Sequence, residues 1–257
     1  MRFASLGSGS RGNAHLIETR HVRVLIDCGF TAREIERRLD LLQVEPASLD
    51  AILITHEHSD HVRGLGVLAR RYRLPVWMTF GTHAGTGTGN LPQLHLIHSE
   101  SGVFNIGDLQ ISPYTVPHDA REPCQFVFRC SQGNKLGLLT DIGHITPHVL
   151  AQLQDCASLI LEFNHDPEML AMGPYPPSLQ ARVGGKHGHL NNHQSVDLLS
   201  RLETARLQHL VAAHLSEKNN SPDRVKTTLC DRHPHLIDRL SFAAQSRPSG
   251  WYEMTTS

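Results

Sequence analysis

Three histidines and an aspartate occur within six positions of one stretch, His56-Glu57-His58-Ser59-Asp60-His61. Imidazole and carboxylate groups together are ligands that Zn²⁺, Mn²⁺ and Fe²⁺ share. His56 and His58 are two residues apart, so in an extended backbone their side chains point the same way. A histidine-rich exposed loop is the alternative interpretation, but such a cluster directly after an apolar run is rare by chance. The stretch therefore predicts a metal site.

The residues around this stretch predict that it connects a strand to a helix. Residues 50–55 form a short, β-rich and uncharged run after Asp50, which is typical of a buried strand. After His61, apolar residues recur at helical spacing up to about Tyr72. The polar cluster is therefore expected in the loop between the two elements.

Three more candidate ligands follow apolar runs in the same way. His118, Asp141 and His214 each come next, or nearly next, after a predicted strand. Because sites in open α/β sheets collect beyond the carboxyl ends of strands, these side chains can converge. A single histidine after a strand is more often a surface or hydrogen-bonding residue. These three residues indicate a metal site only because they occur together with the first stretch.

The seven candidate ligands divide into two metal sets with one shared carboxylate. His56, His58 and His118 would hold one ion, Asp60, His61 and His214 would hold the other, and Asp141 would bridge them. Two ions about 4 Å apart share a hydroxide at neutral pH and offset charge on the developing intermediate. We expect two divalent ions per chain, zinc or manganese with iron as a further option, and catalytic roles for Asp60 and Asp141.

Composition is that of an ordinary globular protein. The chain has 257 residues, 39% hydrophobic and 19% charged, enough for one large α/β core or two small domains. No apolar run approaches the ~20 residues of a membrane span, and the start is broken too early for a signal peptide. The five cysteines include no Cys-x-x-Cys pair. We therefore predict reduced thiols, a cytoplasmic location and no membrane contact.

The net charge of −1 does not give the basic footprint that is usual for nucleic-acid binders. A local basic patch stays an option, although a solvated helix face is the simpler interpretation of the arginines that follow the first motif. These are Arg63, Arg70, Arg71 and Arg73.

The chain as a whole predicts one domain over residues 1–257. Strands outnumber helices, and the candidate ligands are spread from end to end. Two segments are expected to lack regular structure. Residues 81–90 are rich in glycine and threonine and are expected to be mobile, and residues 169–188 are expected to form an irregular insertion near the site.

The ligand pattern resembles that of the metallo-β-lactamase superfamily. His-x-His-x-Asp-His is followed by His118, Asp141 and His214 in the order that is typical of this family. The resemblance implies an α/β fold, a four-layered αβ/βα sandwich of two mixed β-sheets with a dinuclear site at one edge. It also implies that the seven candidate residues have the metal roles given above.

Longer tracts are similar to the YycJ (WalJ) branch of this superfamily. They cover residues 6–13, 55–65, 116–119, 162–170, 188–192 and 213–220. Proteins of this branch are associated with DNA exonuclease activity, and related branches include ribonuclease Z and ribonuclease J. The branch usually has serine at the positions of Phe163 and Asn191. The resemblance implies a nucleic-acid substrate, DNA rather than RNA.

The resemblance also implies substrate contacts. In related nucleases a Gly-His pair comparable to Gly188-His189 contacts the substrate phosphate, so His189 is a catalytic and substrate-binding candidate that stabilises the phosphorane or protonates the leaving oxygen. Helix capping is the alternative role for His189. Asn164 and His165, at a strand end, could orient His118 or bind a phosphate.

The loop after the first strand adds weaker candidates. Ser8, Ser10 and Asn13 lie in a Gly/Ser-rich segment whose backbone can approach an anion closely, although a hairpin connection is the commoner role for such a loop. Asp27, at another strand end, could support the metal histidines.

A dinuclear phosphodiesterase, most specifically a DNA exonuclease in which the bridging hydroxide attacks phosphorus, is the leading hypothesis. Hydrolysis of a small ester, thioester, lactone or cyclic phosphodiester is the enzymatic alternative, and the near-neutral charge favours it because DNA binding draws on Lys/Arg–phosphate contacts. A scaffold protein with a structural metal is the third hypothesis. Structural sites are closed and usually mononuclear, so seven ligands argue against it. The sequence leaves open whether the chain forms a homodimer.

Overall fold

A computed structural model describes residues 1–98 and 102–255, and the chain divides into two compact units. The first unit contains Met1–Thr115, Ala120–Asn134 and the residues from Ala243 onward, and the second contains Val116–Asp119 and Lys135–Phe242. The strands of the described residues form two seven-stranded sheets, with parallel and antiparallel pairs in each. The predicted α/β fold with two mixed sheets is confirmed. That the whole chain acts as one domain stays a prediction.

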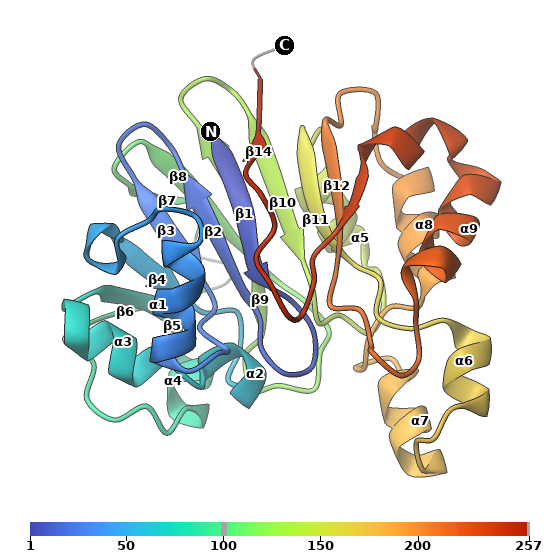
Figure 1. The fold of residues 1–257 in the computed structure, drawn as a ribbon, viewed down its shortest axis with the longest axis horizontal. Helices are drawn as coiled ribbons and strands as arrows, with labels where there is room; N and C mark the ends of the chain where they lie inside the picture. Colours follow the sequence, from blue (N-terminus) through green and yellow to red (C-terminus); the bar gives the residue numbers. More distant parts are fainter. Residues whose placement is uncertain (99–101, 256–257) are drawn as a thin grey trace. The chain divides into compact units, whose positions relative to one another are not determined.

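One complete sheet lies in the first unit (Figure 1). Its strand order is β14 (Tyr252–Glu253), β1 (Arg2–Gly7), β2 (Ala14–Glu18), β3 (Arg23–Ile26), β4 (Ala51–Leu53), β5 (Pro75–Thr79) and β6 (Gln93–Ile97). Pairing is antiparallel from β14 to β3 and parallel from β3 to β6. Strand β4 is apolar and buried throughout, and β3 is so apart from Arg23 at its start, as expected of strands covered on both faces.

Helices of the first unit cover one face of this sheet. The remaining elements of the unit are α1 (Ala32–Asp40), η1 (Pro46–Ser48), α2 (Ser59–Val62), α3 (Leu65–Tyr72), α4 (Phe80–Gly85) and the antiparallel strands β7 (Phe104–Ile106), β8 (Leu109–Thr115) and β9 (Cys124–Cys130). Ile35 of α1 and Leu68 of α3 share a buried core with Leu25 and Ile52 of the sheet. This packing fixes the segment between β4 and α3, where the first motif lies.

The second unit is built around four parallel strands in the order β10, β11, β12, β13. Its elements are β10 (Lys135–Leu139), α5 (Pro147–Leu153), β11 (Ser158–Glu162), α6 (Pro167–Met172), α7 (Pro177–Val183), α8 (Asn192–Ser200), β12 (His209–Ala213), α9 (Pro222–Arg232), η2 (Pro234–Arg239) and β13 (Leu240–Phe242). Helices α8 and α9 pack side by side (Figure 1). Because the strands are parallel, the residues that follow β10, β11 and β12 emerge at the same edge.

Both segments that were expected to lack regular structure contain helices, so the irregular structure expected of them is wrong. The mobility of residues 81–90 and the insertion near the site stay predictions. In residues 81–90, helix α4 begins after Thr79, whose side chain accepts from Thr82 N, and Glu122 Oε2 accepts from Gly81 N. In residues 169–188, most of α6 and all of α7 are helical. Asp166 caps α6, and a proline stands in the first turn of each helix, where no amide hydrogen is needed.

Two further features agree with the composition. None of the five cysteines, all within the described residues, forms a disulfide, and Cys230 is exposed whereas the other four are buried. In the part of the chain that the structure describes, no helix has the length and apolar character required to cross a bilayer.

Candidate metal centre

In the first unit, the six-residue motif begins just after β4 and ends inside the one-turn helix α2. His58 is the N-cap of α2, and Asp60 and His61 lie within the helix rather than in the predicted loop. Strand β4 ends at Leu53, earlier than predicted, because the amide of Thr55 donates to the Asp27 side chain (Oδ1, 2.9 Å) instead of to a neighbouring strand. The backbone just before the motif is therefore fixed by the Asp27 side chain and not by a strand-to-strand hydrogen bond.

The predicted ligands of this motif gather in one place. The ring centroids of His56 and His58 are 4.5 Å apart, and those of His56 and His61 are 4.1 Å apart. His56 and His61 are buried, whereas the Asp60 side chain keeps 20% of its surface exposed. The grouping of these four residues within the unit is what the spacing predicted.

Asp27 orients two of these histidines. Its Oδ2 lies 2.8 Å from His61 Nδ1, and both of its oxygens accept from Thr55 Oγ1 at 3.0 Å. Thr55 Oγ1 in turn lies 3.0 Å from His56 Nδ1, so it accepts there. Burial raises the pKa of Asp27 above its usual value, although His61 and Thr55 act in the opposite direction. Asp27 thus supports His61 directly and His56 through Thr55, as predicted for a supporting carboxylate.

Two of the predicted phosphate-loop residues are buried and contact the motif instead of solvent. Asn13 Oδ1 accepts from Ser8 Oγ at 2.8 Å and from Gly9 N at 2.9 Å. The amide of Asn13 donates to Asp60 O at 2.8 Å. Ser10 is exposed. Asn13 therefore holds the Asp60 backbone in place, and Ser8 holds Asn13. Contact of Ser8, Ser10 or Asn13 with substrate stays a prediction.

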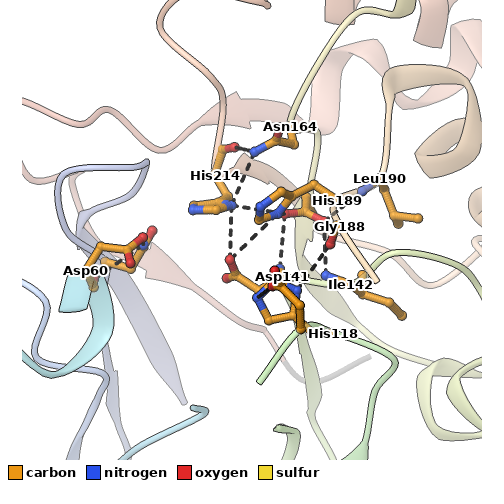
Figure 2. Close-up of polar contacts among 12 residues, drawn as sticks. Asp60, His118, Asp141, Ile142, Asn164, Gly188, His189, Leu190 and His214 are labelled. Carbon is orange, nitrogen blue, oxygen red and sulfur yellow. Dashed lines mark hydrogen bonds and ion pairs between the residues drawn. The ribbon is translucent and has the colours of Figure 1, made fainter. Parts of the chain in front are cut away.

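In the second unit, four predicted residues gather where β10 and β12 end. His214 follows β12 directly and Asp141 follows β10 after one residue, with left-handed φ values of 55° and 52° that non-glycine residues rarely adopt. His189 lies between the other two rings, 5.3 Å from His118 and 5.1 Å from His214 between centroids. Asp141 Oδ1 is 3.4 Å from His214 Nδ1 (Figure 2).

A buried glutamate that the sequence prediction missed holds this group together. Glu162, the last residue of β11, accepts hydrogen bonds from five donors at 2.9–3.2 Å. They are the amides of Asp141, Ile142 and Leu190 and the Nδ1 atoms of His189 and His214. Glu162 differs from Asp141 and His214 in that it is the last residue inside its apolar strand and not a residue that follows one.

Glu162 is a support for ligands rather than a ligand. Burial by itself would raise the pKa of Glu162, but the charges and hydrogen bonds of His189 and His214 outweigh burial and hold the pKa well below its usual value. The ionised carboxylate offers about four lone-pair sites, which five donors already occupy. No acceptor capacity is left for an ion, so the negative charge acts through the two histidines.

Asn164 and His165 also support the site from behind. Asn164 Nδ2 donates to His214 O at 3.0 Å, so Asn164 orients His214 and not His118 as predicted. In Figure 2, Asn164, His189 and Asp141 surround His214. His165 is 2% exposed, and burial lowers its pKa to about 4, which keeps the ring neutral at pH 7. A phosphate contact for either residue stays a prediction.

The donor chemistry of both units fits a divalent cation. Five histidines place Nδ1 within 3.2 Å of an oxygen atom, which leaves Nε2 as the ring nitrogen that would bind metal. They are His56, His61, His118, His189 and His214. In the second unit, donor atoms of Asp141, His189 and His214 lie within 4.8 Å of one another. Imidazoles backed by oxygen and joined by a carboxylate are typical of metal sites.

Comparison with known proteins agrees with this geometry. The beta-lactamase superfamily domain matches residues 22–214, and the chain belongs to this superfamily. The chain is 34% identical to exodeoxyribonuclease YycJ of Bacillus anthracis, covering 89% of this chain and 88% of that protein. It is 32% identical to exodeoxyribonuclease WalJ of Streptococcus pneumoniae serotype 2 (strain D39), covering 90% and 87%. The predicted resemblance to the YycJ (WalJ) branch is therefore confirmed.

A solved structure supports the same fold. The metallo-beta-lactamase fold protein YhfI from Bacillus subtilis matches with a TM-score of 0.75 at 15% identity, covering 98% of this chain and 99% of that one. At this identity the match speaks for the fold alone. Family, fold and donor chemistry together define the chain as a metal-dependent hydrolase.

Proposed function

We propose that this hydrolase is a phosphodiesterase that degrades DNA from an end. The metal-dependent part rests on one observation, the four histidines of the proposed metal set whose Nδ1 atoms face an oxygen and whose Nε2 atoms would bind metal. The DNA part rests on two relatives, each named an exodeoxyribonuclease and each aligned with about nine tenths of this chain.

The division of ligands predicted from the sequence is the proposed metal set. His56, His58 and His118 would hold one ion, Asp60, His61 and His214 the second, and Asp141 both. When bound, divalent ions supply a nucleophile at neutral pH and offset negative charge that develops on phosphorus. Zinc and manganese suit this donor set equally, and iron is the third option.

The chain's own residues orient the imidazole rings and protonate the leaving oxygen. Asp27 and Glu162 fix the imidazole rings so that each presents the same nitrogen. His189 is the proposed proton donor to the leaving oxygen, because its side chain is 20% exposed and its Nδ1 is anchored on Glu162 at 2.9 Å. An anchored ring needs no reorganisation when charge develops on the substrate.

One observation favours a second candidate function, the hydrolysis of a small ester or cyclic phosphodiester. The net charge of −1 gives the chain no overall attraction for a polyanion. A small substrate would need only the metal ligands and His189, not an extended basic surface.

The discriminating experiment offers metal-loaded protein end-labelled single- and double-stranded DNA, the same strands as RNA, and bis-p-nitrophenyl phosphate. Stepwise shortening of labelled DNA, with slower cleavage of RNA, is the expected result. Cleavage of the small diester with no polynucleotide shortened by zinc-, manganese- or iron-loaded protein would replace the exonuclease proposal with the small-substrate one.

Asp141→Asn tests the shared carboxylate. Activity is expected to fall more than about 100-fold, since losing a ligand costs more than losing an outer partner. Asp155→Asn is the matched control, because Asp155 is exposed in the same unit and has a similar left-handed φ of 58°. Full activity of Asp141→Asn, or one ion per chain at saturation by elemental analysis, would contradict the dinuclear proposal.

A further inference from the structure

A cavity of about 300 Å³ in the first unit begins at the same one-turn helix as the candidate ligands. Its lining residues are Ser59, Val62, Arg63, Gly66, Val67, Arg70, Gly87 and Thr88. Ser59 directly precedes Asp60, so the cavity and the metal motif share α2. We propose that this cavity is a subsite for the nucleotide next to the scissile phosphodiester, which rests on the function proposed above.

The charge of the cavity is positive and unbalanced. Two arginines and no acidic residue line it. Arg70 is held in place, because its Nη1 donates to Thr88 O at 2.8 Å and to Asn90 O at 3.2 Å. The exposed Arg63 guanidinium has no hydrogen bond or ion pair to another described residue. Arg63 is therefore available for a phosphate, and Arg70 adds a fixed positive charge.

Two cavities elsewhere show that volume is not the distinguishing feature. One of about 400 Å³ in the second unit is lined by Arg232 and Asp197, which form an ion pair at 3.5 Å. Another of about 330 Å³ in the first unit is lined by Arg20 and also by Asp108. In both, a carboxylate accompanies the positive charge. The cavity at α2 differs in charge, not in size.

The apolar part of the cavity lining suits a sugar or a base. Val62 and Val67 line the cavity, and Val67 is 47% exposed. The backbone of the glycine-rich residues 81–90 lies close against α3, because a Cβ on Gly66 would be 2.3 Å from Thr88 O. A nucleotide offers an anionic phosphate beside an apolar face, which matches an arginine beside two valines. Inorganic phosphate would leave the valines unused.

The position of the cavity indicates which nucleotide it would take. Arg63 follows Ser59 by one helical turn, about 5.4 Å of rise. A strand whose scissile phosphate lies at Asp60 therefore reaches Arg63 with a neighbouring nucleotide. This assigns a role to the arginine that follows the motif, which from the sequence alone resembled a solvated helix face.

Two variants test the subsite by different means. Arg63→Gln removes the charge at an exposed position. Gly87→Leu fills the cavity without a clash, because a Cβ there meets no atom within 4 Å and the φ of Gly87 is not in the left-handed region. Gly250→Leu is the matched control, since Gly250 also faces open space with an ordinary φ. Arg206→Gln, at an exposed position before the amino end of β12, is the control for charge.

The readout is the Kd of a labelled single-stranded oligodeoxynucleotide, measured by fluorescence anisotropy over a series of salt concentrations. Arg63→Gln is expected to raise Kd about tenfold and to reduce the slope of log K against log salt by about 0.7, the value for one phosphate contact on a single strand. Gly87→Leu is expected to raise Kd with the slope unchanged. The two controls should match the wild type, and thermal unfolding of every variant reports on folding.

The outcomes separate this inference from the proposed function. If the wild type binds and degrades DNA but Arg63→Gln keeps its Kd and salt slope, the subsite is wrong and the exonuclease proposal stands. Equal losses in Arg63→Gln and Arg206→Gln would also refute it, because they would indicate nonspecific charge attraction. If the wild type cleaves bis-p-nitrophenyl phosphate but binds no oligonucleotide, the exonuclease proposal and the subsite both fail.

Discussion

Each unit has one buried carboxylate that orients candidate metal histidines, and the two do so by different means. Asp27 contacts His61 and reaches His56 through Thr55. Glu162 contacts His189 and His214 directly and also accepts three backbone amides. Both carboxylates are buried, with Glu162 at 0% and Asp27 at 1% exposure. The two carboxylates therefore differ in their hydrogen-bond partners and not in how deeply they are buried.

The difference appears in the direction of the pKa shifts. Burial dominates at Asp27 and raises its pKa, whereas the two histidines of Glu162 outweigh burial and lower its pKa. A carboxylate that directly holds two rings and three amides is therefore firmly ionised. Its negative charge makes His214 a stronger ligand and anchors the ring of His189. The second unit concentrates its support in one residue, and the first unit distributes it over a short chain of contacts.

The largest effect is expected from Glu162→Gln. Glutamine keeps the shape but replaces one acceptor oxygen with a donor. That donor faces either the two histidines and the Asp141 amide or the amides of Ile142 and Leu190. We expect metal affinity and activity to fall about 100-fold, at the upper end for an outer partner. The unfolding free energy should fall by about 3 kcal/mol, because a buried charged network loses one partner.

The measurements are metal titration by calorimetry, turnover of labelled DNA, and chemical denaturation. Glu168→Gln, an exposed glutamate on α6, is the matched control and should change none of them beyond about 0.5 kcal/mol. A Glu162→Gln protein with wild-type metal affinity would show that the five contacts stabilise the fold without tuning the site.

A smaller effect is expected from Asp27→Asn. Of the candidate metal histidines, His61 is the one that contacts this carboxylate directly, and the Thr55 hydrogen bonds can be kept by the asparagine oxygen. We expect about a tenfold loss of metal affinity, the lower end for an outer partner. The same titration measures it, with the exposed Asp40→Asn on α1 as control. A loss greater than that of Glu162→Gln would reverse the comparison between the units.

The difference between the two units also explains which site residues could be predicted from the sequence. The first half of the candidate site lies in six adjacent residues, so local spacing was enough to identify it. Asp141 and His214 were identified because each follows an apolar strand. Glu162 was missed because it is the last residue of its strand and no neighbouring ligand marks it. Its role depends on donors from three other segments, which no local pattern contains.

The fold shows a similar division. The strand predicted over residues 50–55 forms as β4 (Ala51–Leu53), because its apolar run is bounded by polar residues. Helices α6 and α7 were missed because Gly173 and the prolines after it interrupt the segment, although each interruption marks a helix boundary. Strand β13 was missed because three residues carry too little periodicity, and only pairing with β12 defines it.

The smallest effect is expected at His165. In the second unit this histidine, and not the carboxylate of Glu162, is expected to make stability depend on acid pH. The pKa of His165 is about 4 when folded and about 6.5 when unfolded. Between these values the unfolded chain binds a proton that the folded chain does not, so stability falls as pH falls through this window. At pH 5.5 the loss is about 1 kcal/mol, and Glu162, with its lowered pKa, adds no titration there.

Denaturation of the wild type and of His165→Gln at pH 7.5 and 5.5 measures this contribution. The variant should lose about 1 kcal/mol less on acidification than the wild type, whatever its absolute stability, because only the difference between the two pH values reports the linkage. His193→Gln removes an exposed histidine from α8 and should leave the difference unchanged. Equal acid responses in His165→Gln and the wild type would show that burial of the His165 ring does not set the acid response, which would refute this prediction.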